Sequence, residues 1–121
     1  MPVILPAVKG SFRFRREEHL KKGSEIREVF KRGKRVACRG AKLFVLRNGL
    51  PRNRICFTFS RGFPGAVRRN RDKRLGREAY RALKPRLDGG YDLVFLMYPE
   101  DPGTDRPAQL GYLLAKAGLV T

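Results

Sequence analysis

Apolar residues recur along this chain with two different periods, and the changes of period predict where helices and strands lie. Side chains three or four positions apart share one face of a helix, whereas alternate side chains share one face of a strand. The helical period occurs in three segments, at 24–33, about 66–84 and 108–119. Runs rich in β-branched and aromatic residues occur at 35–38, 42–47, 54–60 and 91–97. The predicted order is therefore helix, three strands, helix, strand, helix.

This order predicts a single α+β domain in which helices pack on one four-stranded sheet. The turn signal Asn48-Gly49-Leu50-Pro51 predicts a hairpin that joins strands 42–47 and 54–60 as antiparallel neighbours. The run 91–97 is apolar almost throughout, which is typical of a central strand buried on both faces.

The first helix carries its own start and stop signals. Ser24 is a suitable N-cap, and Gly33 suits the C′ position just after the last turn. Its apolar stripe consists of Ile26, Val29 and Phe30. The simplest interpretation is that all three side chains face the core.

The helix at 66–84 combines an apolar stripe with an unusual density of positive charge. Seven Lys or Arg residues fall within the sixteen positions 66–81. Leu75, Ala79, Ala82 and Leu83 have the spacing of one helical face. The opposite face is predicted to carry Arg69, Asn70, Lys73, Arg77, Arg81 and Lys84. We expect the apolar face to dock on the core and the cationic face to meet a polyanion.

A charged helix can instead be a solvated surface, but such helices usually mix the two signs. Here ten cations between Arg61 and Arg86 face only two acids, Asp72 and Glu78. Like charges held this closely favour a partner that neutralises them, and nucleic acid is the partner that this charge density indicates.

Composition supports a folded, basic protein. The chain has 121 residues, with 28 Lys or Arg against 11 Asp or Glu, and a formal net charge of +17. Eight Phe, four Tyr and 41% hydrophobic residues argue against disorder. Residues 87–121 carry few of the cations, so the phosphate-facing surface is predicted within the first 86 residues. We expect a flexible lead-in at 1–11 and one RNA-binding domain at 12–121.

The sequence offers little chemistry of its own. Cys38 and Cys56 lack metal-site spacing and are expected to be free thiols in a reducing compartment. No apolar run approaches membrane-spanning length, so we expect a cytoplasmic protein that does not bind a membrane. His19 is the one histidine and is interpreted as a surface residue away from any cleft. The acid pairs Glu17-Glu18 and Asp101/Asp105 lack the third ligand of a two-metal nuclease.

These observations argue against several classes of function. An independent nuclease has no convergent catalytic cluster here. A DNA-binding regulator that uses the basic helix would need a companion helix before it, whereas a strand and the turn Pro64-Gly65 precede this one, so no DNA partner is expected. A structural ribonucleoprotein component, such as a small basic ribosomal protein, remains an alternative.

The basic helix resembles a known signature. Arg69-Asn70-Arg71, followed by Lys73-Arg74 and Arg77-Glu78-Ala79, is similar to the basic-helix signature of the protein subunit of bacterial ribonuclease P. The segments 26–33, 57–61 leading to Ala66-Val67, and 90–94 resemble the same family, and the resemblance covers roughly residues 12–118.

The resemblance implies a role beside a catalytic RNA, which with bound magnesium removes the 5′ leader of precursor tRNA. The protein alone is then expected to bind no cofactor and to hold no catalytic residue. On this model the catalytic RNA is contacted by Arg68, Arg69, Asn70, Arg71, Lys73, Arg74 and Arg77. The resemblance places the single-stranded leader in a cleft between the first helix and the sheet, lined by Ile26, Phe30, Phe44 and Arg61. Aromatic faces stack on unpaired bases while cations follow the backbone.

The chain departs from the family pattern at four positions. Ile26 stands where an aromatic residue is common, and Gly62 replaces a frequent second cation after Arg61. Asp72 places an acid where the signature usually has an apolar residue. Gly76 lies in mid-helix, at a cost of about 1 kcal/mol relative to Ala.

Overall fold

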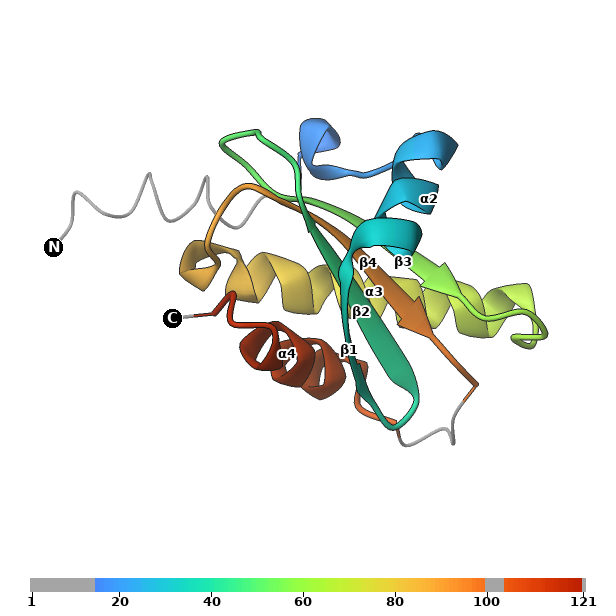
Figure 1. Ribbon diagram of the computed structural model, residues 1–121. Coiled ribbons are helices and arrows are strands. Elements are labelled where there is room, and N and C mark those ends of the chain that lie inside the picture. Colours follow the sequence, from blue (N-terminus) through green and yellow to red (C-terminus); the bar gives the residue numbers. More distant parts are fainter. Residues whose placement is uncertain (1–14, 100–103, 121) are drawn as a thin grey trace, which may run out of the picture.

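The computed structural model describes residues 15–99 and 104–120, and its elements follow the predicted order (Figure 1). The helices are α2 (Gly23–Arg32), α3 (Ala66–Leu83) and α4 (Arg106–Lys116), with short 3-10 turns η1 (Arg16–Glu18) and η2 (Lys84–Arg86). The strands are β1 (Lys34–Cys38), β2 (Ala41–Arg47), β3 (Arg54–Phe59) and β4 (Tyr91–Met97). The lead-in predicted at 1–11 lies outside the described residues, so its boundary stays a prediction.

The four strands form one mixed sheet in the order β1-β2-β4-β3. Strand β4 pairs antiparallel with β2 and parallel with β3. The predicted hairpin between β2 and β3 is therefore wrong, because β4 inserts between them. The true hairpin joins β1 to β2, and Gly40 in its turn has a φ of 84°, a conformation that favours glycine.

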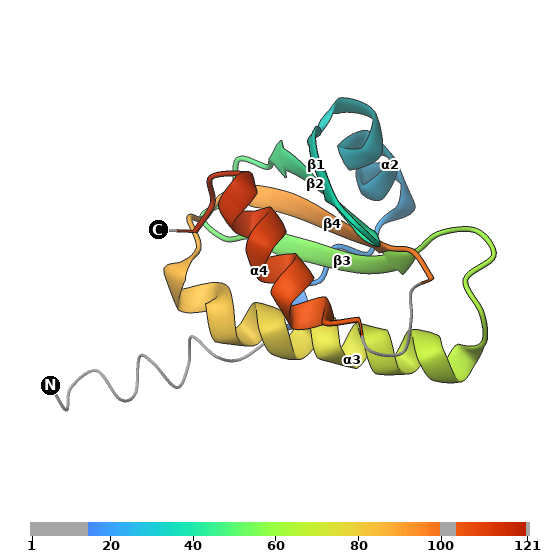
Figure 2. The same cartoon turned by 90° about the horizontal axis from the view of Figure 1, so that it is seen from below.

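Helices cover both faces of the sheet (Figure 2). Helices α3 and α4 lie on one face, over a core that includes Leu93, Phe95 and Met97 of β4. Helix α2 covers part of the other face, where Val94 packs with Val29. Because β4 buries alternate residues on opposite faces, its predicted central position is confirmed. None of the described helices is both long and apolar enough to cross a membrane.

Helix α3 is rotated relative to the apolar stripe read from the sequence. Its buried residues are Asp72, Gly76, Ala79 and Tyr80. Ala79 faces the core as predicted, Leu75 and Leu83 are half-buried, and the inward position predicted for Ala82 is wrong because this residue is exposed. Lys73 and Lys84, predicted on the opposite face, are half-buried.

The rotation is explained by Gly76 and Asp72, which a search for hydrophobic periodicity leaves out because neither has an apolar side chain. A β-carbon at Gly76 would lie 2.8 Å from the ring of Phe57 on β3, so glycine lets α3 approach the sheet. Asp72 turns inward because Arg106 of α4 meets it there. The close approach of Gly76 to Phe57 and the buried Asp72–Arg106 ion pair therefore determine which face of α3 packs on the core.

The ends of α2 also differ from the sequence interpretation. The helix begins at Gly23, with Lys22 as N-cap and no side-chain cap hydrogen bond, so the cap predicted at Ser24 is wrong. Gly33 is the C-cap rather than C′, and its φ of −74° is available to any residue. Glycine is needed there because a β-carbon would lie 2.5 Å from the carbonyl oxygen of Val29.

Candidate nucleic-acid interface

The outer face of α3 presents the basic residues that the sequence singled out. Arg69, Asn70, Arg71, Arg74 and Arg77 are exposed, and Arg68 and Lys73 are half-buried. The Arg68 guanidinium lies 5.7 Å from the centre of the Phe63 ring, a cation–π contact that orients it at the start of the helix. This group of seven residues is called the α3 basic face below.

The Asp72 carboxylate is buried and lies between two guanidinium groups, that of Arg106 inside the protein and, at 3.6 Å, that of Arg71 on the α3 basic face. Arg106 is 1% exposed and donates from Nε to Asp72 Oδ2 at 3.1 Å. The same guanidinium donates to the carbonyl oxygens of Tyr98 (2.6 Å) and Gly40 (3.0 Å). The pair thus ties α3 and α4 to the loop after β4 and to the β1–β2 turn.

The sheet face under α2 carries an aromatic pair. The rings of Phe30 on α2 and Phe44 on β2 meet edge to face, with centroids 4.7 Å apart. Phe30 is 39% exposed, so its predicted position in the core is wrong. Phe44 and Ile26 are half-buried against the small cluster of Leu20, Val29 and Val94.

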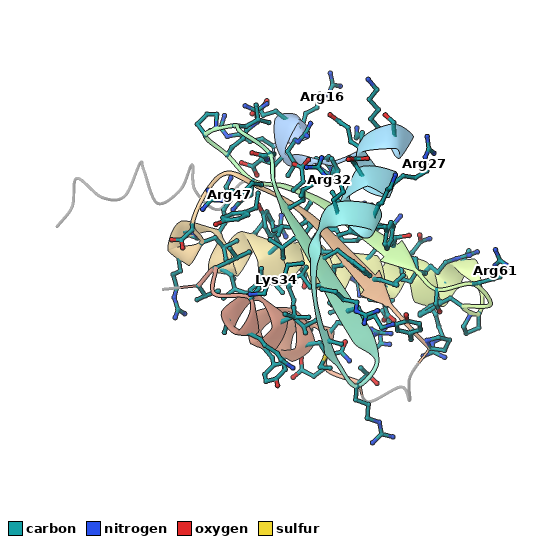
Figure 3. The ribbon with its side chains drawn as sticks, in the orientation of Figure 1. Arg16, Arg27, Arg32, Lys34, Arg47 and Arg61 are labelled. Atoms are coloured by element: carbon teal, nitrogen blue, oxygen red, sulfur yellow. The ribbon has the colours of Figure 1, made fainter. Side chains whose placement is uncertain are left out.

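The structure brings together three of the four residues assigned to the leader cleft. Ile26, Phe30 and Phe44 gather between α2 and the sheet. Arg61 is exposed and projects from the turn between β3 and α3, at the edge of the molecule (Figure 3).

Sequence reasoning missed two residues on this part of the sheet. Lys42 lies two positions before Phe44 on β2, so their side chains share a face. The Lys42 ammonium lies 5.3 Å from the centre of the Tyr98 ring, just beyond β4. Strand alternation around Phe44 could have identified Lys42, whereas its contact with Tyr98 depends on the pairing of β2 with β4.

A charged network fixes α2 over the sheet. Arg54 on β3 donates to Asp92 Oδ1 (2.8 Å) and Oδ2 (2.7 Å) on the neighbouring β4. It also reaches Glu25 of α2, with nitrogen–oxygen distances of 3.3 and 3.4 Å. Hydrogen bonding to Asp92 is the main cause that raises the pKa of Arg54, opposed by burial. The first turn of α2 is thereby attached to the sheet.

His19 lies in a different place from the one predicted. It forms a parallel β-bridge with Ile55 at the free edge of β3. Its side chain lines two adjoining hollows between this edge and α3, of about 130 and 500 Å³. The interpretation of His19 as a residue away from any cleft is therefore wrong. The sequence carried no signal for this, since the bridge is a tertiary contact.

The described residues contain no group of three His, Cys, Asp or Glu side chains that could hold a metal ion. Within the same residues, the buried acids are matched with cations: Asp72 with Arg106, Asp92 with Arg54, and Glu18 with Lys84. Cys38 and Cys56 are both half-buried and form no disulfide, and burial raises the pKa of Cys56.

Comparisons of the sequence and of the structure agree on a family. The family model described as Ribonuclease P matches residues 14–112. The ribonuclease P protein component of Natranaerobius thermophilus is 44% identical over 77 residues, which cover 64% of this chain and 67% of the relative. The RNase P protein of Thermotoga maritima superposes with a TM-score of 0.71 at 27% identity, covering 82% of this chain and 96% of that one. A mutant RNase P protein of Staphylococcus aureus has the same fold, with a TM-score of 0.78 at 21% identity over 85% of this chain and 90% of that one.

Proposed function

The chain belongs to the ribonuclease P protein family, and from this premise we propose which RNA each of its two surfaces binds. As a protein component of ribonuclease P it is part of a ribonuclease holoenzyme that has an RNA partner, and it acts in the maturation of tRNA 5′ ends. The family match does not favour the alternative of a ribosomal protein.

In this proposal the α3 basic face binds the catalytic RNA. The observation that carries the proposal is the exposure of arginines along α3 while its one buried acid, Asp72, is neutralised inside the protein. Guanidinium groups contact phosphate oxygens in a planar, bidentate way, which suits them to an RNA backbone. Binding of this kind releases counterions and weakens as salt rises.

The opposite face of the sheet is proposed to hold the single-stranded leader of precursor tRNA. Phe30 is 39% exposed beside Phe44, and unpaired bases stack on the faces of aromatic rings without requiring a particular sequence. Lys42 and Arg61 supply charge for the leader backbone. The two RNAs would then meet opposite faces of one sheet, in the cytoplasm and with no DNA partner.

Chemistry in this proposal belongs to the catalytic RNA and to magnesium ions that the RNA holds. The protein residues act by binding and orientation. In support, the buried acids of the described residues are each committed to a Lys or Arg partner.

The test compares two triple variants of the full-length chain. Arg69, Arg74 and Arg77, all exposed on α3, are replaced by Ala in one, and Lys31, Lys34 and Arg35, all exposed near β1, in the matched control. Removing one phosphate-binding cation should lower the slope of log affinity for the catalytic RNA against log salt by about 0.7 to 0.9. We expect a slope reduced by about two in the first variant and little changed in the control. Equal slopes in both variants would contradict the assignment of α3.

A further inference from the structure

Four basic side chains from two separate segments line the larger of the two hollows beside α3. Arg74, Arg77 and Arg81 are at positions i, i+3 and i+7 of one helix, so they share one face. His19 faces them from the segment before α2. The hollow has a volume of about 500 Å³, and its lining residues are these four.

Contacts on both sides of His19 fix the backbone of the segment that carries it. The N–H of Leu20 donates to the carbonyl oxygen of Ile55 on β3 at 3.0 Å, and Leu20 itself is buried. Glu18, on the other side, is buried and paired with Lys84 at the end of α3. The segment 18–20 is therefore attached to β3 and to α3 at once, with His19 between the two attachments.

The smaller hollow adjoins the larger one and shares His19 and Arg77 with it. Its lining adds Lys73 of α3 and the half-buried thiol of Cys56 on β3. The titratable and charged groups that face His19 from the surrounding elements are Glu18, Lys21, Cys56, Lys73, Arg74, Arg77 and Arg81. Cations outnumber the acid in this set, and the acid is paired with Lys84.

We propose that the larger hollow is a binding site for one backbone phosphate of the catalytic RNA, held by Arg74, Arg77 and Arg81 together with protonated His19. This inference rests on the proposed function of α3 and adds two residues, His19 and Arg81, to the α3 basic face. A phosphodiester anion in the hollow offsets the mutual repulsion of the three guanidinium groups and accepts their hydrogen bonds. It also places a negative charge next to the imidazole.

Binding at this site is linked to proton uptake. In the free protein the pKa of His19 lies below its ordinary value near 6.5, because of burial first and then of the charges of Lys21 and Arg77. An adjacent phosphate favours the charged imidazolium and raises this pKa. The complex therefore binds more protons than the free protein, and affinity increases as pH falls. The gain is complete below the pKa of the free protein and is lost as pH rises through the pKa of the complex.

The chain has one histidine, so this dependence can be assigned to one side chain. Histidine is the residue whose unperturbed pKa places its charge change between about pH 5 and pH 8. Burial raises the pKa of the Cys56 thiol, which moves its titration away from this range.

The experiment measures the affinity of the full-length protein for the catalytic RNA at about pH 6 and about pH 8, at fixed salt and magnesium. A pKa rise of about one unit on binding corresponds to about tenfold tighter binding well below the pKa of the free protein, and to a few-fold gain at about pH 6. His19→Gln should bind equally at both pH values, at the weaker level. His19→Arg should also be independent of pH, but at the tighter level. A pH dependence that persists in His19→Gln, or none in the wild-type protein, would overturn the site.

A second pair of variants keeps the test independent of His19. Arg81→Ala should reduce both the affinity and its pH dependence, whereas Lys31→Ala, an exposed cation on α2, should leave the pH dependence unchanged. Melting temperatures show whether each variant is folded. If Arg81→Ala keeps the full pH dependence, the phosphate is not bound in this hollow.

Two further outcomes separate this inference from its premise. Precursor tRNA without the catalytic RNA is the second ligand, and a pH dependence seen only with that ligand would contradict the assignment to catalytic RNA. If the wild-type protein binds the catalytic RNA at neither pH, the proposed function itself fails. If it binds with a salt slope carried by α3 but without a pH dependence, only the phosphate site fails.

Discussion

Gly76 and Gly111 are both inside helices, yet their surroundings differ. A β-carbon at Gly76 would lie 2.8 Å from the Phe57 ring, whereas one at Gly111 of α4 would have its nearest neighbour, Leu83 Cδ1, at 3.9 Å. Alanine gains about 1 kcal/mol of helix propensity over glycine at either position. At Gly76 this gain is opposed by overpacking against β3, which typically costs about 1–3 kcal/mol.

We therefore expect Gly111→Ala to raise the free energy of unfolding and Gly76→Ala to lower it. Urea denaturation of the two variants beside the wild-type protein measures both changes. The close packing of α3 on β3 would be contradicted if Gly76→Ala were as stable as Gly111→Ala.

Two departures from the family pattern have a structural reason that no single segment reveals. Asp72 has a buried partner in Arg106, thirty-four residues further along the chain. Gly76 is matched to Phe57 on a strand that precedes the helix. Sequence reasoning identifies such residues as unusual for a helix, but the compensating contact lies on another element. Asp72 and Gly76 are thus explained only by the packed structure.

At the scale of elements, α2 and β2 together present the aromatic pair, and the two rings differ in burial. Phe30 is 39% exposed to solvent. Phe44 is half-buried and packs against the cluster of Leu20, Val29 and Val94. Truncating Phe30 should therefore cost only part of the about 3–5 kcal/mol of stability expected for a fully buried ring. If a leader base stacks on it, Phe30→Ala should lose about 1–3 kcal/mol of affinity for precursor tRNA.

The measurement is the ratio of precursor to mature tRNA affinity in the reconstituted holoenzyme, because mature tRNA has no leader. Tyr112→Ala is the matched control, since Tyr112 is a 55% exposed aromatic residue on α4, which packs on the other face of the sheet. The ratio should fall in Phe30→Ala and stay constant in Tyr112→Ala. A stable Phe30→Ala protein with an unchanged ratio would show that this ring does not contact the leader.

The sequence predicted the bounds of helices and strands better than it predicted which strands pair. Strand β4 has the predicted bounds, and α3 ends one residue before the predicted position. Local periodicity is sufficient for this, because it reports which side chains are buried along one segment. The predicted β2–β3 hairpin was wrong because strand pairing depends on a later segment. Strand β4 lies between β2 and β3 and forms backbone hydrogen bonds with both. The bridge that brings His19 to β3 is non-local in the same way.

At the scale of the whole molecule, the sheet separates two surfaces with different requirements. The α3 face combines closely spaced arginines with the hollow at His19, whereas the α2 face combines aromatic rings with scattered cations. A folded RNA presents its phosphates outward, and a single strand also offers its bases. This difference is why we assign the catalytic RNA to one face and the leader to the other. With a net charge of +17, both interactions should weaken at high salt.

The most direct test of the account is the rate at which the leader is removed from precursor tRNA at low magnesium. Three samples are compared: the full-length protein alone, the catalytic RNA alone, and the two together. We predict no cleavage by the protein, slow cleavage by the RNA and much faster cleavage by the complex, because the protein contributes binding while the RNA contributes the chemistry. Magnesium-dependent cleavage by RNA-free protein, or a rate for the complex no higher than for the RNA alone, would contradict the account.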